Sequence, residues 1–252
     1  MTNVPGERPV VHGRFWVHGQ SYWTFDGINV VWPARGLSSK NHLVGLINGV
    51  GWVWKNSEVW GAHSFAGVLV AGTVPGQPAD WTFSHSCVHD TYPSNGTNQD
   101  QNLYVNTGLT AGAGLVSHNL FYNATNGMGI KLGGSDVHSG GAAHVTVDHN
   151  TIYNSAQNLM VSWDSHDNRV TNNVFARTGS GYANVRGYQL VGARNTAAAN
   201  TWWGGIRFLM NDPGYAGVVD QGNEIQANPQ FDSTASCSGF HIANPDLVDQ
   251  GR

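Results

Sequence analysis

The sequence predicts an all-β chain that folds as a parallel β-helix, a solenoid of about eight coils. Three observations predict this fold class. A strand–bend–strand phrase recurs along the chain, two columns of apolar residues keep a fixed distance from the bend, and no amphipathic helix separates the strands. Only 11% of the 252 residues are charged and 33 are glycines, which argues against long solvated helices and against disorder.

The recurrent phrase is clearest in VTVDHNTIYN, residues 145–154, with Asn150 at the bend. Aligned on this bend, successive phrases are 29, 29, 33, 31, 23, 27 and 23 residues apart, which is typical of stacked repeats. Asn suits a bend because it tolerates the left-handed conformation and its amide can bond to the next coil. We therefore interpret these residues as structural. The bend positions are Ile28, Ser57, Ser86, Asn119, Asn150, Asn173, Asn200 and Asn223.

Two apolar columns and a second set of strands accompany the bends. Each coil has one apolar face that it cannot bury alone, so we expect the coils to stack about 4.8 Å apart over one core. Three residues before the bend lie Phe25, Trp54, Phe83, Val116, Val147, Val170, Ala197 and Asp220. Two residues after it lie Val30, Val59, Val88, Phe121, Ile152, Phe175, Trp202 and Ile225. The second strands are predicted at 67–72, 101–106, 129–134, 158–163, 188–192 and 207–212.

The whole chain, 1–252, is predicted to be one domain, with a lead-in coil (1–20), repeat coils (21–226) and a closing segment (227–252). The net charge of −4 and the scattered basic residues exclude nucleic acid and membrane surfaces as partners. The N-terminus lacks the layout of a signal peptide. Cys87 and Cys237 leave two alternatives open, one disulfide or two buried thiols.

Three segments carry a resemblance to a known family: ERPVVHG (7–13), SYWTFDGINV (21–30) and the tail at 228–251. They resemble the first coils and the closing segment of the right-handed parallel β-helix repeat proteins, the pectate-lyase-like group, many of which are carbohydrate-active enzymes. The resemblance implies a right-handed solenoid, a polysaccharide or oligosaccharide as partner and an extracellular location. Family members usually carry a cap before the first coil. We therefore expect an uncapped N-terminal coil, open to a second copy or a partner chain.

A functional cleft is expected between the loop at 89–101 and the face of the second strands. The outward residues of that face are predicted to be Leu69, Tyr104, Lys131, Met160 and Gln189. Lys131 is one of only three lysines and interrupts an apolar, Gly-rich strand. The sequence therefore marks Lys131 as the centre of the cleft.

Polysaccharide lyases that act on uronates need a carboxylate neutraliser, a base and a proton donor. On the resemblance, Lys131 is the base or the neutraliser, Tyr104 or His166 the proton donor and Arg186 a substrate clamp, with Asp164 beside them. The function predicted on this ground is β-elimination on a uronate-containing glycan.

Two other functions remain open. A glycoside hydrolase would use paired carboxylates, for which Asp136, Asp164 and Asp167 are the candidates, although the motifs of polygalacturonase-type β-helices are missing. A non-catalytic glycan-binding or assembly β-helix is the third alternative. No cofactor is expected; Ca²⁺ is the alternative, through Asp100, Asp136, Asp164 and Asp167, which lack the dense spacing of a calcium loop.

Two further columns flank the bend. Sugar rings could stack on an exposed aromatic strip three residues after it, although such ladders also stabilise strands. The predicted substrate-binding residues are Trp60, His89, Tyr122 and Tyr153 from this strip, together with Asp100 and Asp136. His85, His118 and His149 precede the bend, and we expect them to be hydrogen-bonded there, because coils about 4.8 Å apart rarely let ligands converge on one metal ion.

Overall fold

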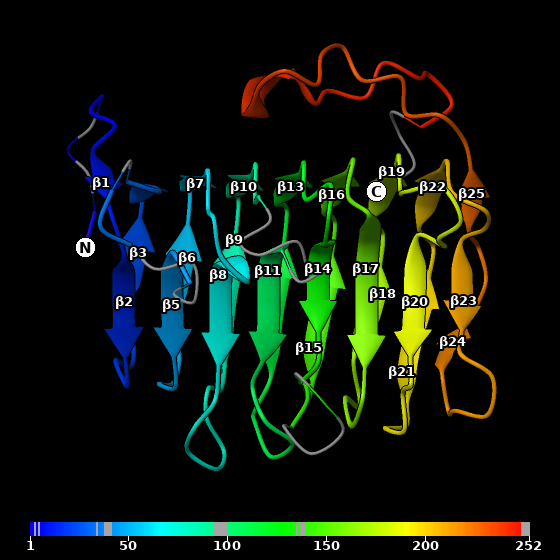
Figure 1. Ribbon diagram of the computed structural model, residues 1–252, viewed down its shortest axis with the longest axis horizontal. Coiled ribbons are helices and arrows are strands. Elements are labelled where there is room, and N and C mark those ends of the chain that lie inside the picture. The colour runs from blue at the N-terminus through cyan, green and yellow to red at the C-terminus, as the bar shows by residue number, and fades with distance from the viewer. Residues whose placement is uncertain are drawn as a thin grey trace.

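The protein is a right-handed parallel β-helix, as the computed structural model shows in three parallel sheets that stand around one core (Figure 1). Each coil passes through sheet C, sheet A and sheet B in turn. The structure describes residues 1–2, 4, 6–33, 35–37, 42–92, 100–134, 136 and 140–247. Within these ranges, no helix has the length and apolar character needed to cross a membrane.

The three sheets consist of short strands, each of which lies beside the strand of the next coil. In spatial order, sheet A contains β3 (Thr24–Asp26), β6 (Val53–Lys55), β9 (Trp81–Ser84), β12 (Gly114–Ser117), β15 (Val145–Asp148), β18 (Arg169–Thr171), β21 (Asn195–Ala198) and β24 (Val218–Asp220). Sheet B contains β1 (Val10–His12), β4 (Asn29–Val31), β7 (Glu58–Trp60), β10 (Cys87–His89), β13 (Leu120–Tyr122), β16 (Thr151–Tyr153), β19 (Val174–Ala176), β22 (Thr201–Trp203) and β25 (Ile225–Gln226). Sheet C contains β2 (Phe15–His18), β5 (Val44–Ile47), β8 (Ala66–Ala71), β11 (Gln101–Asn106), β14 (Met128–Leu132), β17 (Gln157–Ser162), β20 (Val185–Tyr188) and β23 (Leu209–Asn211). A short 3₁₀ turn, η1 (Cys237–Gly239), lies in the tail.

The register confirms the two apolar columns. In sheet A the column from Phe25 to Asp220 pairs residue by residue, and in sheet B the column from Val30 to Trp202 does the same. Both columns fill the core with large side chains, except at Asp220, which is exposed. The fully buried column members include Trp54, Phe83, Phe121 and Phe175, and Trp52 and Trp81 are buried beside them.

Buried Asn side chains connect the bends between sheets A and B. The Nδ2 group of Asn119 donates to Oδ1 of Asn150, Asn150 donates to Asn173 and Asn173 donates to Asn200, each over 3.0 Å. Each of these Oδ1 atoms also accepts the backbone N–H of the same Asn whose side chain donates to it. We call these four residues the bend row.

The last bend differs from the prediction, because it contains one more residue than the others. Glu224, not Asn223, follows Asn200 in the row, and its Oε2 accepts the backbone N–H of Asn200 over 2.8 Å. Trp202 consequently pairs with Gln226 instead of Ile225. A carboxylate can replace the amide here because it supplies the same acceptor atoms. Burial raises the pKa of Glu224 to about 7.

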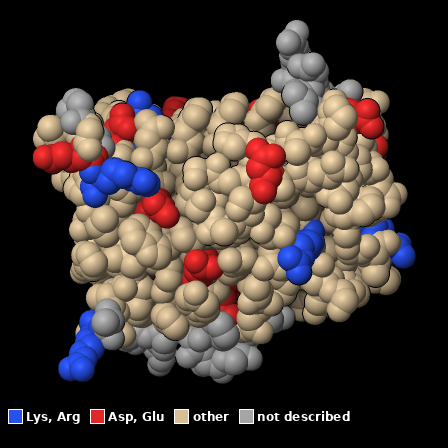
Figure 2. Space-filling view, turned by 90° about the horizontal axis from the view of Figure 1, so that it is seen from above, with Lys and Arg blue, Asp and Glu red and all other residues tan. Residues whose placement is uncertain are grey.

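The tail returns over the outer face of sheet B, from β25 back toward β10 (Figure 1). A disulfide joins Cys237 in the tail to Cys87 in β10, with the two Cα atoms 6.1 Å apart. Of the two alternatives that the sequence left open for these cysteines, the structure therefore has the bridge. On the face seen from above, acidic and basic side chains gather at the left end and are spread singly over the rest (Figure 2).

Candidate functional site

One column of outward residues on sheet C carries candidate functional side chains. Tyr104 pairs with Leu69 and with Lys131, Lys131 pairs with Met160, and Met160 pairs with Arg186. The prediction of this face is confirmed for its first four residues. The prediction of Gln189 was wrong, because the strand at this level is Val185–Tyr188 rather than 188–192. Arg186 takes the outward position.

Lys131 lies in a cavity of about 200 Å³ on this face. Its side chain is buried, and its Nζ atom lies 4.9 Å from the centre of the Tyr104 ring. Within the described part of the chain, no carboxylate forms an ion pair with Lys131. An ammonium without a counter-charge is costly to bury, and burial lowers the pKa of Lys131 to about 8.

Tyr104 lies one coil before Lys131 and is half-buried. Burial raises the pKa of its hydroxyl to about 12, and Asp136 contributes to the same effect. The hydroxyl therefore keeps its proton at neutral and mildly basic pH and can donate it to a leaving oxygen.

Arg186 lies two coils beyond Lys131 and lines the same cavity. Asp212 holds the guanidinium, with Nε at 3.1 Å and Nη2 at 2.8 Å from Oδ1. The guanidinium carbon also lies 4.7 Å from the centre of the Tyr188 ring. These contacts fix the position of Arg186 and leave Nη1 without a hydrogen bond among the described residues.

Two buried amide groups line the cavity beside Lys131. Gln157 is 3% exposed and Gln101 is 2% exposed. Gln157 Nε2 and Gln101 Oε1 have no hydrogen-bond partner in the part of the chain that the structure describes. A buried donor and a buried acceptor without partners are costly, and a hydroxyl-rich ligand can satisfy both.

The sequence did not reveal these amides, nor Trp163, Tyr182 and Tyr188, which also line the cavity. Their place depends on where strands β17 and β20 begin and end. A strand was predicted at the apolar run YQLVG (188–192), but the strand is VRGY (185–188). Gly187 interrupts the alternation of large apolar residues in this strand.

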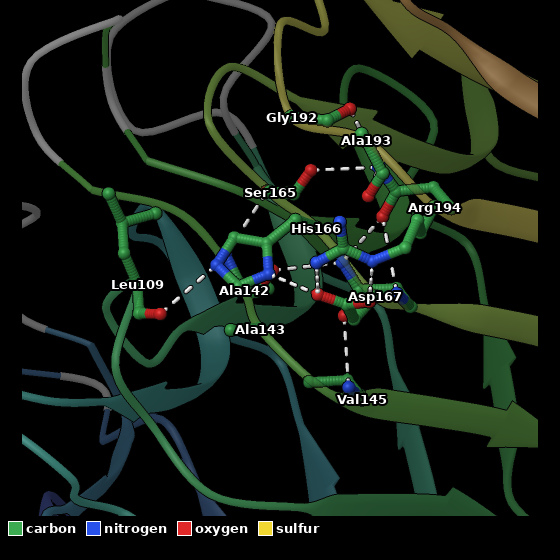
Figure 3. Close-up of polar contacts among 12 residues, drawn as sticks. Leu109, Ala142, Ala143, Val145, Ser165, His166, Asp167, Gly192, Ala193 and Arg194 are labelled. Carbon is green, nitrogen blue, oxygen red and sulfur yellow. Dashed lines mark hydrogen bonds and ion pairs between the residues drawn. The ribbon is translucent and has the colours of Figure 1, made fainter.

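His166 lies apart from this cavity, at the turn between sheets C and A (Figure 3). Its Nδ1 is 2.7 Å from Asp167 Oδ2 and its Nε2 is 3.0 Å from the carbonyl oxygen of Leu109. Both ring nitrogens therefore face acceptors, and a doubly protonated ring satisfies both contacts. The lining residues of the sheet C cavity include neither His166 nor Tyr104. The Tyr104 ring nevertheless contacts Lys131, whereas no contact joins His166 to Lys131 among the described residues.

Asp167 belongs to the same turn and is held by Arg194, whose Nη2 lies 2.6 Å from Oδ2 (Figure 3). Arg194 and, second, His166 hold the pKa of the Asp167 carboxyl well below its usual range. A catalytic acid needs a raised pKa, so this geometry disfavours Asp167 as the acid of a hydrolase.

The remaining predicted carboxylates are spread over the fold. Asp100 is fully buried, and its Oδ2 accepts from Asn126 at 3.0 Å. Asp136 is exposed, and Asp164 is half-buried next to Trp163. The loop at 89–101, expected as the wall of the cleft, lies outside the described residues from 93 to 99.

The aromatic column on sheet B was correctly placed but is not an exposed strip. Trp60, His89, Tyr122 and Tyr153 pair in that order on adjacent strands. Tyr122 and Tyr153 are only 3% and 8% exposed, because Phe240 of the tail packs against both rings. Sugar cannot stack on buried rings, so the prediction was wrong for Tyr122, Tyr153 and His89, which is 7% exposed. For Trp60, which is half-buried, it stays a prediction.

The three histidines before the bend stack on one another. Ring centres of His85 and His118 lie 5.0 Å apart and those of His118 and His149 5.2 Å apart, with ring planes within 4°. His149 Nδ1 is 2.7 Å from Asp148 Oδ2. Parallel rings keep their nitrogens side by side, so this stack does not converge on one ion.

Two groups of possible metal ligands occur among the described residues: Cys87, His89 and Cys237, and His144, His166 and Asp167. Neither is the set of oxygen ligands that Ca²⁺ takes. Calcium binding therefore stays a prediction from sequence.

No protein-family model matches the chain, and a search of curated proteins finds no significant match. Among solved structures, the chain is similar to an alginate lyase from Paenibacillus sp. str. FPU-7, with a TM-score of 0.45 and 14% identity over 86% of this chain and 91% of that one. It is also similar to DFA-IIIase from Arthrobacter chlorophenolicus A6, with a TM-score of 0.44 and 10% identity over 87% of this chain and 60% of that one. PfbA, a surface adhesin of Streptococcus pneumoniae, gives a TM-score of 0.32 and 11% identity over 82% of this chain and 70% of that one. At these identities and TM-scores, the similarities support no inference about activity, substrate or partners.

Proposed function

We propose that the protein is a carbohydrate-active lyase that cleaves a uronate-containing glycan by β-elimination in the sheet C cavity. The observation that carries this proposal is the buried amine of Lys131, whose pKa lies at about 8 and which has no carboxylate partner in the described part of the chain. A lysine of this kind is uncharged in a large fraction of molecules at mildly basic pH. It can therefore accept a proton as a general base.

In the proposed reaction, Lys131 removes the proton from the carbon next to the carboxylate of the bound uronate. The electron pair of that C–H bond forms a double bond to the neighbouring carbon, and the bond from this carbon to the glycosidic oxygen breaks. The hydroxyl of Tyr104, whose pKa burial raises to about 12, gives its proton to the departing oxygen. Arg186 holds the carboxylate and stabilises the negative charge that develops on it.

The unpaired amides support a hydroxylated ligand. Gln157 Nε2 can donate to a sugar oxygen, and Gln101 Oε1 can accept from a sugar hydroxyl. The exposed edge of Tyr182 and the ring of Trp163 provide apolar surface at the same cavity. Such a mixture of a few polar groups and aromatic rings is typical of carbohydrate sites.

The proposal is tested by incubating the protein with a panel of acidic polysaccharides and following the ultraviolet absorbance of unsaturated uronate products. We expect product with at least one polysaccharide, and a rate that rises with pH through about 8 as Lys131 loses its proton. Lys131→Met should lower the rate by at least about 100-fold, which is the usual contribution of a general base.

Lys55→Met is the matched control, because Lys55 is paired with Asp26 on sheet A and lies outside the cavity lining. It should leave the rate unchanged. Absence of product from every polysaccharide, or equal rates for Lys131→Met and the wild type, would contradict the proposal.

A further inference from the structure

Three possible metal ligands, Cys87, His89 and Cys237, lie together on sheet B beneath the tail, and Glu58 lies beside two of them, at a site separate from the cavity of Lys131. Cys87 in β10 pairs with Glu58 in β7, and Cys237 reaches them from the tail. Cys237 Sγ lies 3.5 Å from Glu58 Oε1, and His89 Nε2 lies 3.1 Å from the same oxygen. The ligand atoms of Cys87, His89 and Cys237 all lie within 4.8 Å of one another. We call these four residues the Cys87 cluster.

Neighbouring groups orient two members of the cluster. Asp90 Oδ2 lies 2.8 Å from His89 Nδ1 and holds the proton there, so that Nε2 faces the cluster. Arg8 Nη2 donates to Glu58 Oε2 over 3.0 Å, so that Oε1 faces the cluster. A carboxylate behind the distal nitrogen of a histidine is the usual support of a metal-ligating imidazole.

The atoms of the Cys87 cluster that face one another have few protons to donate in hydrogen bonds. The disulfide sulfurs have none to donate, and an ionised Glu58 has none. The contact between His89 and Glu58 is therefore a hydrogen bond only when Nε2 is protonated as well as Nδ1. A cation would satisfy the lone pairs of Glu58 and His89, and thiolates released by reduction of the disulfide would add two further donors.

We propose that reduction of the Cys87–Cys237 disulfide converts the Cys87 cluster into a tetrahedral zinc site with two thiolates, one imidazole and one carboxylate. Zinc bonds of about 2.0–2.3 Å place the ligand atoms roughly 3.3–3.8 Å apart. The contact of Cys237 with Glu58, at 3.5 Å, already fits this range, and that of His89 with Glu58 is close to it. The two sulfur atoms, which are bonded to each other in the disulfide, must move apart most to reach this spacing.

The chemistry balances with a phosphine as reductant. The phosphine gives two electrons to the disulfide and takes oxygen from water as phosphine oxide, and the two protons of that water convert the separated sulfurs to thiols. Zn²⁺ then binds the two sulfurs and releases the two thiol protons. The ion has access, because a cavity of about 630 Å³ is lined by Glu58, Cys87 and Cys237.

The test compares oxidised and phosphine-reduced protein after incubation with Zn²⁺ and removal of unbound metal. We expect one zinc ion per reduced chain and none per oxidised chain. Co²⁺ in place of zinc should give the visible spectrum of a tetrahedral site with thiolate ligands. Glu58→Gln should weaken zinc binding by at least about 10-fold, because even groups behind the ligands contribute that much.

His118→Ala is the control, since His118 lines the same cavity outside the Cys87 cluster, and it should bind zinc as the wild type does. Reduced protein that retains no zinc would overturn the proposal. Equal affinity of Glu58→Gln and wild type would also overturn it, because the two thiolates and His89 would then explain the binding without the carboxylate. If reduction loosens the tail, zinc must raise the melting temperature of the reduced protein; no rise counts against the site.

Discussion

At the scale of single residues, Lys131 combines an unfavourable environment with a useful chemistry. The cost is visible in its pKa, which burial lowers from 10.5 to about 8. A difference of this size corresponds to roughly 3 kcal/mol between the charged and the neutral form. A residue that keeps such a cost without an ion pair in the described chain is a candidate for function.

Replacing Lys131 by Met should therefore stabilise the protein while it removes activity. Below pH 8 both the folded and the unfolded state hold the proton, and the folded state bears the full cost. Between pH 8 and 10.5 the folded state loses its proton first, so the cost disappears as pH rises. We expect the free energy of unfolding of Lys131→Met to exceed that of the wild type by about 1–3 kcal/mol at pH 7.

The measurement is urea denaturation at pH 7 and pH 10, where the difference between the two proteins should shrink. Lys55→Met, at a partly exposed ion pair, should change stability by less than about 1 kcal/mol at either pH. A less stable Lys131→Met at pH 7 would show that the amine makes favourable contacts in the folded protein.

The residues that sequence identified are those that interrupt a pattern. Lys131 is a cation that interrupts an apolar, Gly-rich strand, whereas Arg186 was named on the family resemblance alone; both line the cavity. Gln157 is polar at the first position of its strand, where alternation gives no signal. His166 was named as a proton donor on the family resemblance, but it lies in the turn between β17 and β18, away from Lys131.

At the scale of elements, the bend row ties each coil to the next. Asn150 is 1% exposed. Its Oδ1 accepts from the backbone and the side chain of Asn119, and its Nδ2 donates to Val116, Asp148 and Asn173. One side chain therefore satisfies backbone groups in two adjacent coils.

Asn150→Ala should lower the free energy of unfolding by about 3 kcal/mol, because it leaves several buried donors and acceptors without partners. Thermal and urea denaturation check this value. Thr146→Ala, on the partly exposed face of β15 in the same coil, should cost less than about 1 kcal/mol. Equal losses from the two substitutions would mean that the bend row contributes no more than an ordinary strand position.

The columns of elements could be predicted because a repeat places the same residue type at the same offset. Prediction was wrong where the offset changes, at the extra residue before Glu224 and in the strand Val185–Tyr188. The aromatic column was placed on the right strands, but no local pattern indicated that Phe240 returns to cover it.

At the scale of the whole molecule, sheet C and sheet B have different roles. The tail closes the outer face of sheet B and is joined to it by the disulfide. Sheet C keeps its cavity with Lys131 and Arg186. The single-domain organisation of 1–252 and an N-terminal interface to a second copy or a partner stay predictions.

The pKa of Lys131 in the folded protein tests this account most directly, and it needs no knowledge of the substrate. The chain has three lysines, so protein labelled with ¹³C at the lysine Cε gives few signals, and Lys131→Met identifies the one that belongs to Lys131. Titration by NMR should show that signal changing at about pH 8. A midpoint near 10.5, the ordinary value for lysine, would mean that the amine is solvated and charged, and would contradict its role as a base.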